Sequence, residues 1–337
     1  MSSIEFDIPE EHRIPFLKYY KQKIAPKCAP FEAKREGVNQ RRRENAKFTT
    51  PIYYICITVI LGAFAGLLGV QFMLVPMDYF VPLMIGVFLP VPVIALVVIA
   101  SGKESDELYN AAFEKLYPIS LKYFGDDFAL TRAPKVDFSL FLELGLLPKT
   151  DKQYAQNCLK GTYNKVPFQF YEVDAYNTKS NNNGSVERET IFNGVLLVCN
   201  IPKRFNGTTL LVTDKGSLKN RIEGFKTKLS RVKLEDVRFE RCFEVYSSDQ
   251  VEARYLLNPL MMENLLVLSR ELNAKVEACF YQKQLLIKIP TKHHFFINQL
   301  DLDRPIDFKL NIERMFTELG YTFSIIDTLK LDKHTGL

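Results

Sequence analysis

The sequence lacks the residue patterns that carry most enzyme chemistry. Its six cysteines lie far apart with no CxxC pair, and its four histidines show no metal-ligand spacing such as HExxH. The stretch GKES at 102–105 has neither the upstream glycine loop nor the preceding strand of a phosphate-binding P-loop. We therefore expect no metal, no cofactor and no catalytic residue, and these absences weigh against an enzyme.

A cleavable signal peptide is also missing. The first twelve residues, MSSIEFDIPEEH, are acidic and polar, and no basic segment leads into an apolar core. The first apolar segment begins near residue 51, which is too late for ordinary cleavage. We therefore expect the apolar segments to persist in the mature protein.

Two long stretches contain no Lys, Arg, Asp, Glu or His, although the whole chain has an ordinary charge content and a net charge of +5. Residues 51–75 and 80–100 each reach the roughly 20 helical residues that a hydrocarbon core about 30 Å thick requires. Backbone polar groups in lipid must be satisfied internally, so both stretches are expected to be helices. Only residues 76–79 separate them, and so short a link predicts a two-helix transmembrane hairpin.

The distribution of basic residues predicts the orientation of this hairpin. A cluster of Lys and Arg residues precedes the first stretch, the connecting loop has none, and Lys103 follows the second stretch. The cluster consists of Lys34, Arg35, Arg41, Arg42, Arg43 and Lys47. Because positive residues favour the cytosolic side, we expect both termini to be cytosolic.

Small residues mark a packing face on the first predicted helix. Gly62, Gly66 and Gly69 lie on neighbouring turns, and such spacing lets helix backbones approach closely. Two partners fit this face: the second helix, where Gly86 is available, or another copy of the chain. Two prolines near mid-depth of the second helix predict a kink, and without an ionisable group nearby they indicate a bent anchor.

The first 50 residues are expected to form a cytosolic helical arm. Apolar residues between Phe16 and Ile24 recur at helical spacing and predict a short amphipathic helix that ends before Pro26. A second helix is predicted from about Pro30 to Lys47. Its three consecutive arginines suit contact with anionic headgroups, and they also suffice to orient the hairpin.

Residues 101–337 predict a soluble, cytosolic α+β domain with a mostly antiparallel sheet and covering helices. Apolar residues at helical spacing predict the helices, and runs of β-branched and aromatic residues predict the strands. The predicted helices are 105–124, 136–146, 258–272 with Asn258 as N-cap, and 306–319 ended by Gly320. The predicted strands are 165–176, 189–201 and 208–212, followed by a hairpin over 276–290 that turns near Gln282-Lys283. Successive short strands favour antiparallel pairing.

Beside the apolar stretches, several motifs follow one another along the chain. They are Gly161-Thr-Tyr163, Val166-Pro-Phe168 with Glu172, Phe192-Asn-Gly194, Phe205-Asn-Gly-Thr208 and, most distinctive, FERCFEVYSSDQVEARYLLNP at 239–259. Together with the hairpin, this order resembles the membrane proteins grouped as domain-of-unknown-function family 3137. The resemblance implies a bacterial, membrane-bound protein, and it implies no activity or catalytic residue. From this and the hairpin we expect a multi-pass protein of the bacterial inner membrane.

The segment from Tyr246 to Arg254 concentrates polar side chains between a predicted strand and a predicted helix. One reading is an unrecognised hydrolase site near Ser248 and Asp249, which would need a base beside the serine. The other reading is structural, with Ser248 or Asp249 as N-cap and Glu252 paired with Arg254. The sequence favours the structural reading, because no histidine is near.

The stretch 215–233 predicts a basic amphipathic helix. Its apolar face carries residues such as Leu218 and Phe225, and basic residues occupy the rest. The candidate residues for contact with a membrane surface or a partner are Lys219, Arg221, Lys226, Lys228 and Arg231. Such a helix either lies on an anionic bilayer or packs on its own domain with a solvated basic face. Nucleic acid is not expected as a partner, because aromatic residues for base stacking are absent.

Three functions remain open on the sequence. The leading one is a membrane-tethered cytosolic interaction or scaffold module, which binds a protein partner in addition to the lipid bilayer. The second is a component of a membrane transport or assembly system that forms a homo-oligomer through Gly62 and Gly66. The third is the hydrolase near Ser248 and Asp249.

Overall fold

The computed structural model describes residues 10–72, 76–88, 90–180, 186–203, 205–213, 229–295 and 308–331. The chain divides into two compact units, which we describe separately. The helical unit comprises Lys18–Ile119 and Asn298–Leu310. The sheet unit comprises Met1–Leu17, Ser120–Ile297 and Asn311–Leu337.

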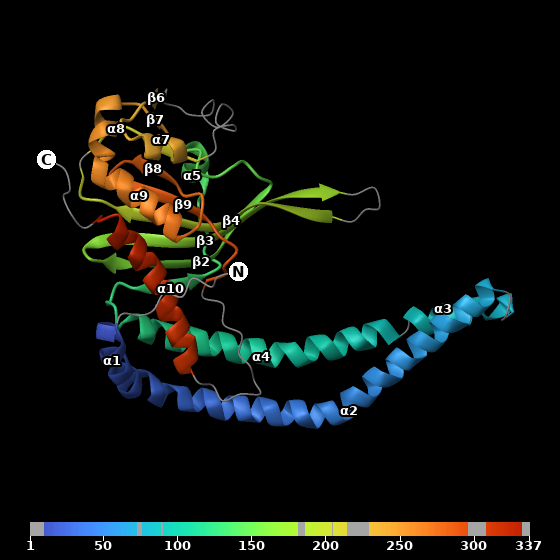
Figure 1. Cartoon of the computed structure of the whole chain (residues 1–337). Coiled ribbons are helices and arrows are strands. Elements are labelled where there is room, and N and C mark those ends of the chain that lie inside the picture. The colour runs from blue at the N-terminus through green and yellow to red at the C-terminus, as the bar shows by residue number, and fades with distance from the viewer. Residues whose placement is uncertain are drawn as a thin grey trace. The chain divides into compact units, whose positions relative to one another are not determined.

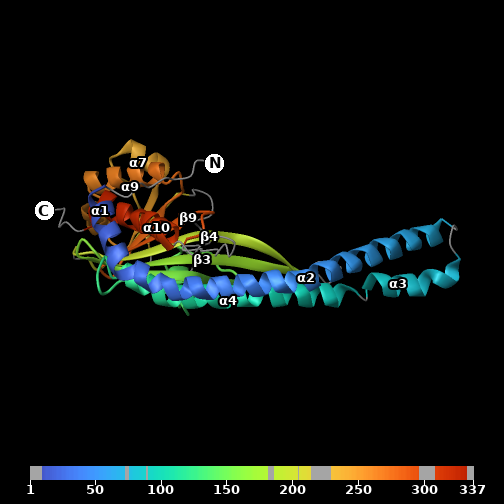
Figure 2. The same ribbon diagram turned by 90° about the horizontal axis from the view of Figure 1, so that it is seen from below.

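The helical unit is dominated by one long helix, α2. The described helices up to Leu121 are α1 (Glu10–Tyr19), most of which belongs to the sheet unit, the π-helical turn η1 (Tyr20–Ile24), α2 (Ala25–Gln71), the 3-10 turn η2 (Met77–Tyr79), α3 (Phe80–Phe88) and α4 (Pro90–Leu121). Helix α2 has 47 residues and runs without interruption from the charged arm into the first apolar stretch (Figure 2). The predicted arm helix and the first predicted span are therefore one helix.

The prediction that a helix ends before Pro26 is wrong. Helical structure continues from α1 through η1 into α2. Pro26 lies in the first turn of α2, where its missing N–H has no helical acceptor in any case. Pro30 and Pro51 lie inside α2, and each removes one backbone hydrogen bond without ending the helix.

Of the two predicted spans, the structure confirms one helix with the length and composition to cross a membrane. It lies within the helical run Pro15–Gln71, whereas the second apolar helix, Met77–Pro92, is shorter. The second span therefore stays a prediction. The kink predicted at Pro90 and Pro92 falls beside residue 89, which lies outside the described residues, so it also stays a prediction.

The sheet unit contains an antiparallel sheet, as predicted (Figure 1). The described strands are β1 (Ala129–Arg132), β2 (Lys152–Tyr163), β3 (Val166–Ser180), β4 (Val186–Asn200), β5 (Thr209–Val212), β6 (Ser230–Val232), β7 (Glu244–Ser247), β8 (Glu277–Tyr281) and β9 (Gln284–Pro290). Their order across the sheet is β1-β2-β3-β4-β9-β8-β5-β7-β6. The sequence predicts neither β1 nor β2.

The turn between β8 and β9 fixes how these two strands pair. Gln282 and Lys283 have φ values of 45° and 62°, which give the two-residue turn between β8 and β9 the twist that antiparallel strands prefer. The predicted turn at this position is confirmed.

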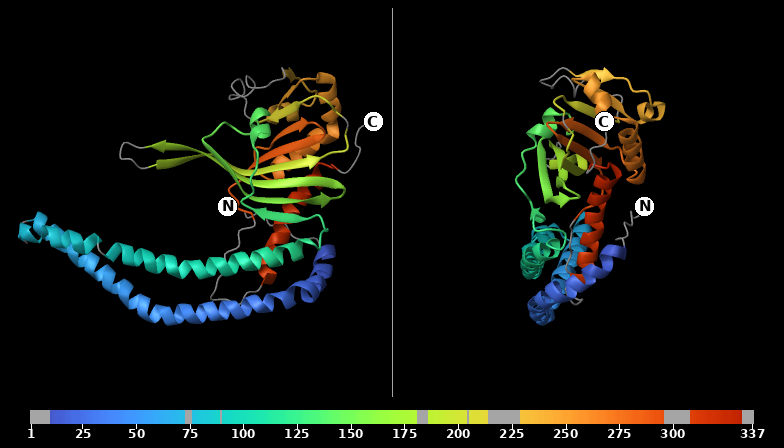
Figure 3. Two further views of the ribbon diagram at one scale, coloured as in Figure 1. Left: turned by 180° about the vertical axis from the view of Figure 1, so that it is seen from behind. Right: turned by 90° about the vertical axis from the view of Figure 1, so that its left-hand side faces the viewer.

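Strands β3 and β4 extend past their neighbours (Figure 3). The pairing of β2 with β3 ends at Tyr176 of β3, and the pairing of β9 with β4 ends at Gly194 of β4.

Helices cover both faces of the sheet. Helices α9 (Pro259–Glu271) and α10 (Phe308–Thr328) lie on one face, and the short α5 (Ser139–Glu143) lies on the other (Figures 1 and 3). Two further short helices are α7 (Val237–Cys242) and α8 (Gln250–Leu256). Asn258 caps α9 as predicted, and its Oδ1 accepts a hydrogen bond from Met261 N at 2.9 Å.

Helix α10 does not end at Gly320, and that prediction is wrong. The helix continues to Thr328, and Ile325 and Ile326 in its last turns are fully buried. Burial of such side chains stabilises the longer helix by about 2 kcal/mol each, which outweighs the cost of about 1 kcal/mol for a glycine inside a helix.

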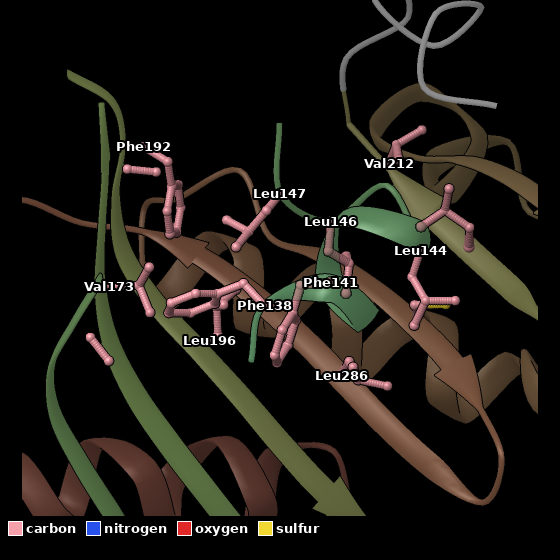
Figure 4. Close-up of a cluster of buried hydrophobic side chains, with 14 of the residues drawn as sticks. Phe138, Phe141, Leu144, Leu146, Leu147, Val173, Phe192, Leu196, Val212 and Leu286 are labelled. Atoms are coloured by element: carbon pink, nitrogen blue, oxygen red, sulfur yellow. The ribbon is translucent and has the colours of Figure 1, made fainter. Parts of the chain in front are cut away.

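The core below α5 is formed by side chains from distant parts of the chain (Figure 4). Phe138, Phe141 and Leu146 contact the strands that carry Leu196 and Leu286. The predicted helix 136–146 is therefore reduced to the five residues of α5, and the rest of the segment packs as loop. This cluster fixes one face of the sheet unit.

Candidate functional site

An apolar surface that is exposed in the structure surrounds the end of the helical unit. We define the apolar sleeve as the apolar residues of α2 from Ile52 to Phe72 together with those of η2 and α3 from Met77 to Phe88. Only 6% of the most apolar 18-residue window of the long helix is buried. Leu61 and Phe64 are 63% and 56% exposed. In water each such side chain forfeits about 1.5–3 kcal/mol of burial, so the sleeve is suited to an apolar surrounding.

Aromatic residues stand at both ends of the sleeve. Tyr53 and Tyr54 mark the end nearer the charged arm, and Phe72, Tyr79 and Phe80 mark the other, and all of them are exposed. Tyr53 on α2 and Phe72, which directly follows α2, are 19 residues apart. At about 1.5 Å per residue this spacing spans about 28 Å, close to a hydrocarbon core of about 30 Å. Aromatic side chains are enriched at the two interfaces of a bilayer.

The contact between α2 and α3 shows what surrounds the predicted packing glycines. A Cβ atom at Gly66 would lie 2.6 Å from Leu83 Cδ2, and one at Gly86 would lie 3.1 Å from Ala63 Cβ. A larger residue at Gly86 would press on Ala63, and one at Gly66 would displace the end of the Leu83 side chain. Around Gly62 no atom lies within 4 Å of the Cβ position among the described residues, so this glycine faces open space. Gly69 lies farther along α2.

The distinctive motif at 239–259 meets the Phe205-Asn-Gly-Thr208 motif at the start of α8. Glu252 Oε1 and Oε2 accept hydrogen bonds from Asn206 N at 2.7 Å and Gly207 N at 2.6 Å. Ser248 Oγ accepts from Thr208 N at 2.9 Å. A Cβ atom at Gly207 would lie 2.5 Å from Glu252 Oε2, so a side chain at this position would displace the carboxylate. We call this contact the motif junction.

The hydrogen bonds of the motif junction favour the structural reading of the Tyr246–Arg254 segment. Asp249 Oδ1 accepts from Val251 N at 2.9 Å and Glu252 N at 3.0 Å, so Asp249 is the N-cap of α8. The predicted pairing of Glu252 with Arg254 is wrong. Arg254 donates instead to the carbonyl oxygens of Gln250 and Lys233, at 3.0 and 3.4 Å.

Most of the predicted basic helix lies outside the described residues. Lys219, Arg221, Lys226 and Lys228 all fall there, and their role stays a prediction. Arg231 is described and lies in β6, so a helix through residue 233 is wrong at this end. This segment is a strand because β6 pairs with β7. Arg231 Nη2 lies 3.3 Å from Glu244 Oε1 on β7.

A buried carboxylate on β3 forms a site that sequence reasoning missed. Glu172 is 3% exposed, and its carboxylate accepts hydrogen bonds from Asn157 Nδ2 at 2.8 Å and Phe295 N at 3.2 Å. His294 Nδ1 lies 3.2 Å from the same carboxylate, and His293 Nε2 lies 3.9 Å from Glu318 Oε1 on α10. Burial raises the pKa of Glu172, although its hydrogen bonds act in the opposite direction.

This cluster holds the segment after β9 against β2 and β3. The available sequence signal is the position of Glu172, which shares a strand face with the apolar residues Phe168 and Phe170. A polar residue at an inward position needs partners, and here they come from β2 and the segment that follows β9. Among the described residues, no group of three or more His, Cys, Asp or Glu side chains is arranged to hold a metal ion.

The fold and these sites define an α+β protein whose described residues form a nine-stranded antiparallel sheet and a long apolar helix. Residues 190–331 match the model of the family described as protein of unknown function (DUF3137), which supports membership of that family. The matched part includes the motif junction, whereas the apolar sleeve and the motifs near Gly161 and Val166 lie outside it.

Comparison with other known proteins adds little. No curated protein matches the chain. One similar solved structure is that of the mycobacterial trehalose monomycolate transport factor A, TtfA, with 13% identity and a TM-score of 0.30 over 62% of this chain and 92% of that chain. A likeness this weak carries no argument about function.

Proposed function

We propose that this chain is a membrane-tethered protein whose sheet unit acts in the cytosol as an interaction or scaffold module. The observation that carries the proposal is the apolar sleeve, whose exposed side chains, aromatic ends and length together match a bilayer. The second apolar stretch completes a hairpin in this proposal, with both termini cytosolic at a bacterial inner membrane. The sheet unit is then held near the bilayer, where it meets a protein partner.

Basic residues of α2 support the proposed orientation. Arg41, Arg42, Arg43 and Lys47 are all exposed and lie just before the apolar part of the same helix. Near an anionic surface each contributes about 1 kcal/mol of attraction. They therefore favour a position at the cytosolic headgroups and oppose transfer across the membrane.

Membrane extraction and reporter fusions test the proposal. We expect the full chain to stay in the membrane fraction after washing at alkaline pH, which removes peripheral proteins. A reporter that is active only in the cytosol should be active when fused before Met1 and also when fused after Leu337. Release of the chain by the alkaline wash would overturn the tether, and a periplasmic signal from either fusion would overturn the topology.

A second candidate function is a component of a membrane transport or assembly system that oligomerises through the hairpin. The observation that favours it is Gly62, which faces open space while Gly66 is closed by Leu83. In the oligomer, Gly62 would give a second copy close approach to α2. Light scattering of the detergent-solubilised chain should then give a mass above one copy, and Gly62→Leu should reduce it to one copy. A wild-type monomer would exclude this candidate.

A further inference from the structure

A hollow of about 420 Å³ lies between α2 and α4 within the helical unit, away from the apolar sleeve. Its lining combines an apolar floor with basic side chains. The lining residues are Pro26, Lys27, Pro30, Phe31, Lys34, Lys115 and Ile119. We call it the lysine hollow. Its volume falls in the range of about 300–1,000 Å³ that is usual for small-molecule sites.

Two prolines shape the floor of the hollow. Pro26 and Pro30 are four residues apart and so lie on one side of α2, where their short rings leave space that longer side chains would fill. Phe31 on α2 is buried, and Ile119 on α4 is half-buried. These four residues offer an apolar surface to a ligand and no charged group.

The rim of the hollow carries three positively charged side chains. Lys27, Lys34 and Lys115 are exposed, and no ion pair joins any of them to another described residue. Their neighbours three and four residues away on the same helix include no Asp or Glu. The three ammonium groups therefore surround an apolar floor with a net positive field.

We propose that the lysine hollow binds a single-chain anionic amphiphile such as a long-chain fatty acid. Its carboxylate would lie among the three lysines, and the first part of its chain would cover the apolar floor. A small inorganic anion would leave the floor exposed to water, and a neutral lipid would leave the lysines without a counter-charge. The hollow therefore fits a ligand that carries a negative charge and an apolar chain in one molecule.

The hollow lies too far from the apolar part of α2 for a lipid of the bilayer to occupy it. Lys34 precedes Pro51, where the apolar part of α2 begins, by 17 residues. At about 1.5 Å per residue this distance is about 25 Å along the helix. A lipid with its chains in the membrane does not reach that far, so the ligand is one that leaves the bilayer.

Photo-crosslinking of the full chain in phosphatidylcholine nanodiscs tests the proposal. The probe is palmitic acid with a photoactivatable diazirine in its chain. We expect cross-links in the peptides that contain Pro26–Lys34 or Lys115–Ile119. Unlabelled palmitate should compete, whereas hexadecanol and inorganic phosphate should not. Competition by phosphate would show a simple anion site, and equal competition by hexadecanol would show a site for any apolar chain; either result overturns the proposal.

Matched variants sharpen this test. Exchange of Lys27, Lys34 and Lys115 for Gln should weaken binding about tenfold or more, because it removes all three positive charges around the carboxylate. Exchange of Lys18, Lys21 and Lys23 for Gln removes the same charge from the same arm outside the hollow and should change binding less than twofold. Equal losses in both variants would mean non-specific attraction. Membrane retention, measured on the same samples, reports separately on the tether.

Discussion

The helical unit and the sheet unit treat apolar side chains in opposite ways. In the sheet unit, large apolar residues such as Phe170 and Leu196 are fully buried. In the helical unit, Leu61 and Phe64 on α2 are more than half exposed. Soluble helices of such length keep a polar face, and this part of α2 has none. The difference is what we expect if the apolar sleeve lies in lipid and the sheet unit lies in water.

Polar groups repeat this contrast. In the sheet unit a buried polar side chain such as Glu172 finds partners on segments distant in sequence. In the sleeve, the hydroxyl of Thr58 donates within its own helix, where Tyr54 O and Ile55 O lie at 2.9 and 2.8 Å. A helix in lipid has to satisfy its polar groups locally in this way.

Charges placed in the middle of the sleeve should have the largest effect. Leu61→Lys combined with Phe64→Lys puts two ammonium groups near the centre of the proposed span. Each costs about 2.5–3.5 kcal/mol at that depth, so most of the protein should leave the membrane fraction or fail to insert. The measurement is the fraction of chain retained after an alkaline wash.

The matched control places the same charge on an exposed apolar residue of the sheet unit. Val186 and Ile191 on β4 are 67% and 41% exposed. Their exchange for Lys should leave membrane retention unchanged, because water already surrounds these positions. If the two pairs of substitutions have equal effects, the contrast between the units does not hold.

Truncation of a core residue should have the next largest effect, and this time in the sheet unit. Phe170 is fully buried, so Phe170→Ala should lower the free energy of unfolding by about 3–5 kcal/mol. Phe64→Ala removes the same atoms from the sleeve and should change the free energy of unfolding by less than about 0.5 kcal/mol. Denaturant unfolding in a mild detergent compares the two variants. A comparable loss for Phe64→Ala would place that ring in a protein core.

The motif junction should give a smaller, coupled effect. Glu252→Ala removes the acceptor of two backbone N–H groups and should cost about 2 kcal/mol. Gly207→Ala displaces the same carboxylate, so the double variant should lose about 1 kcal/mol less than the sum of the two. Glu263→Ala, which breaks an exposed pair with Arg238, is the control and should cost less than about 0.5 kcal/mol. Strict additivity would contradict the account of the junction.

The smallest predicted effect is the pH dependence at Glu172. Burial raises the pKa of this carboxyl in the folded state above its value in the unfolded chain. The wild type is therefore most stable, relative to Glu172→Gln, below the unfolded pKa of about 4.3, and it loses this advantage as pH rises through the folded pKa. We compare the free energies of unfolding of the two proteins between pH 4 and 7, both in a His294→Gln background. The protein with Glu172 should lose stability relative to the Glu172→Gln variant as pH rises. Parallel curves would contradict the raised pKa.

Elements that depend on nearby residues follow from the sequence. The cap of α9 at Asn258 and the turn at Gln282 and Lys283 depend on residues within a few positions, and both are predicted correctly. The sheet architecture follows from successive strand patterns. The apolar part of α2 follows from the absence of charge.

Elements that depend on distant partners do not follow from the sequence. Strand β2 carries polar residues in its first half, and its strand structure depends on pairing with β3. The cluster around Glu172 unites Asn157, Glu172 and His294, which no sequence spacing brings together. The continuation of α10 beyond Gly320 likewise depends on burial of its last turns.

The central claim, that α2 lies in lipid around Phe64, can be tested with a single fluorophore. The chain contains no tryptophan, so Phe64→Trp gives one unambiguous signal. In vesicles whose lipids carry bromine near mid-chain, the account predicts strong quenching of this tryptophan and little quenching of Val186→Trp. Quenching of Phe64→Trp that is no stronger than that of Val186→Trp would contradict the account.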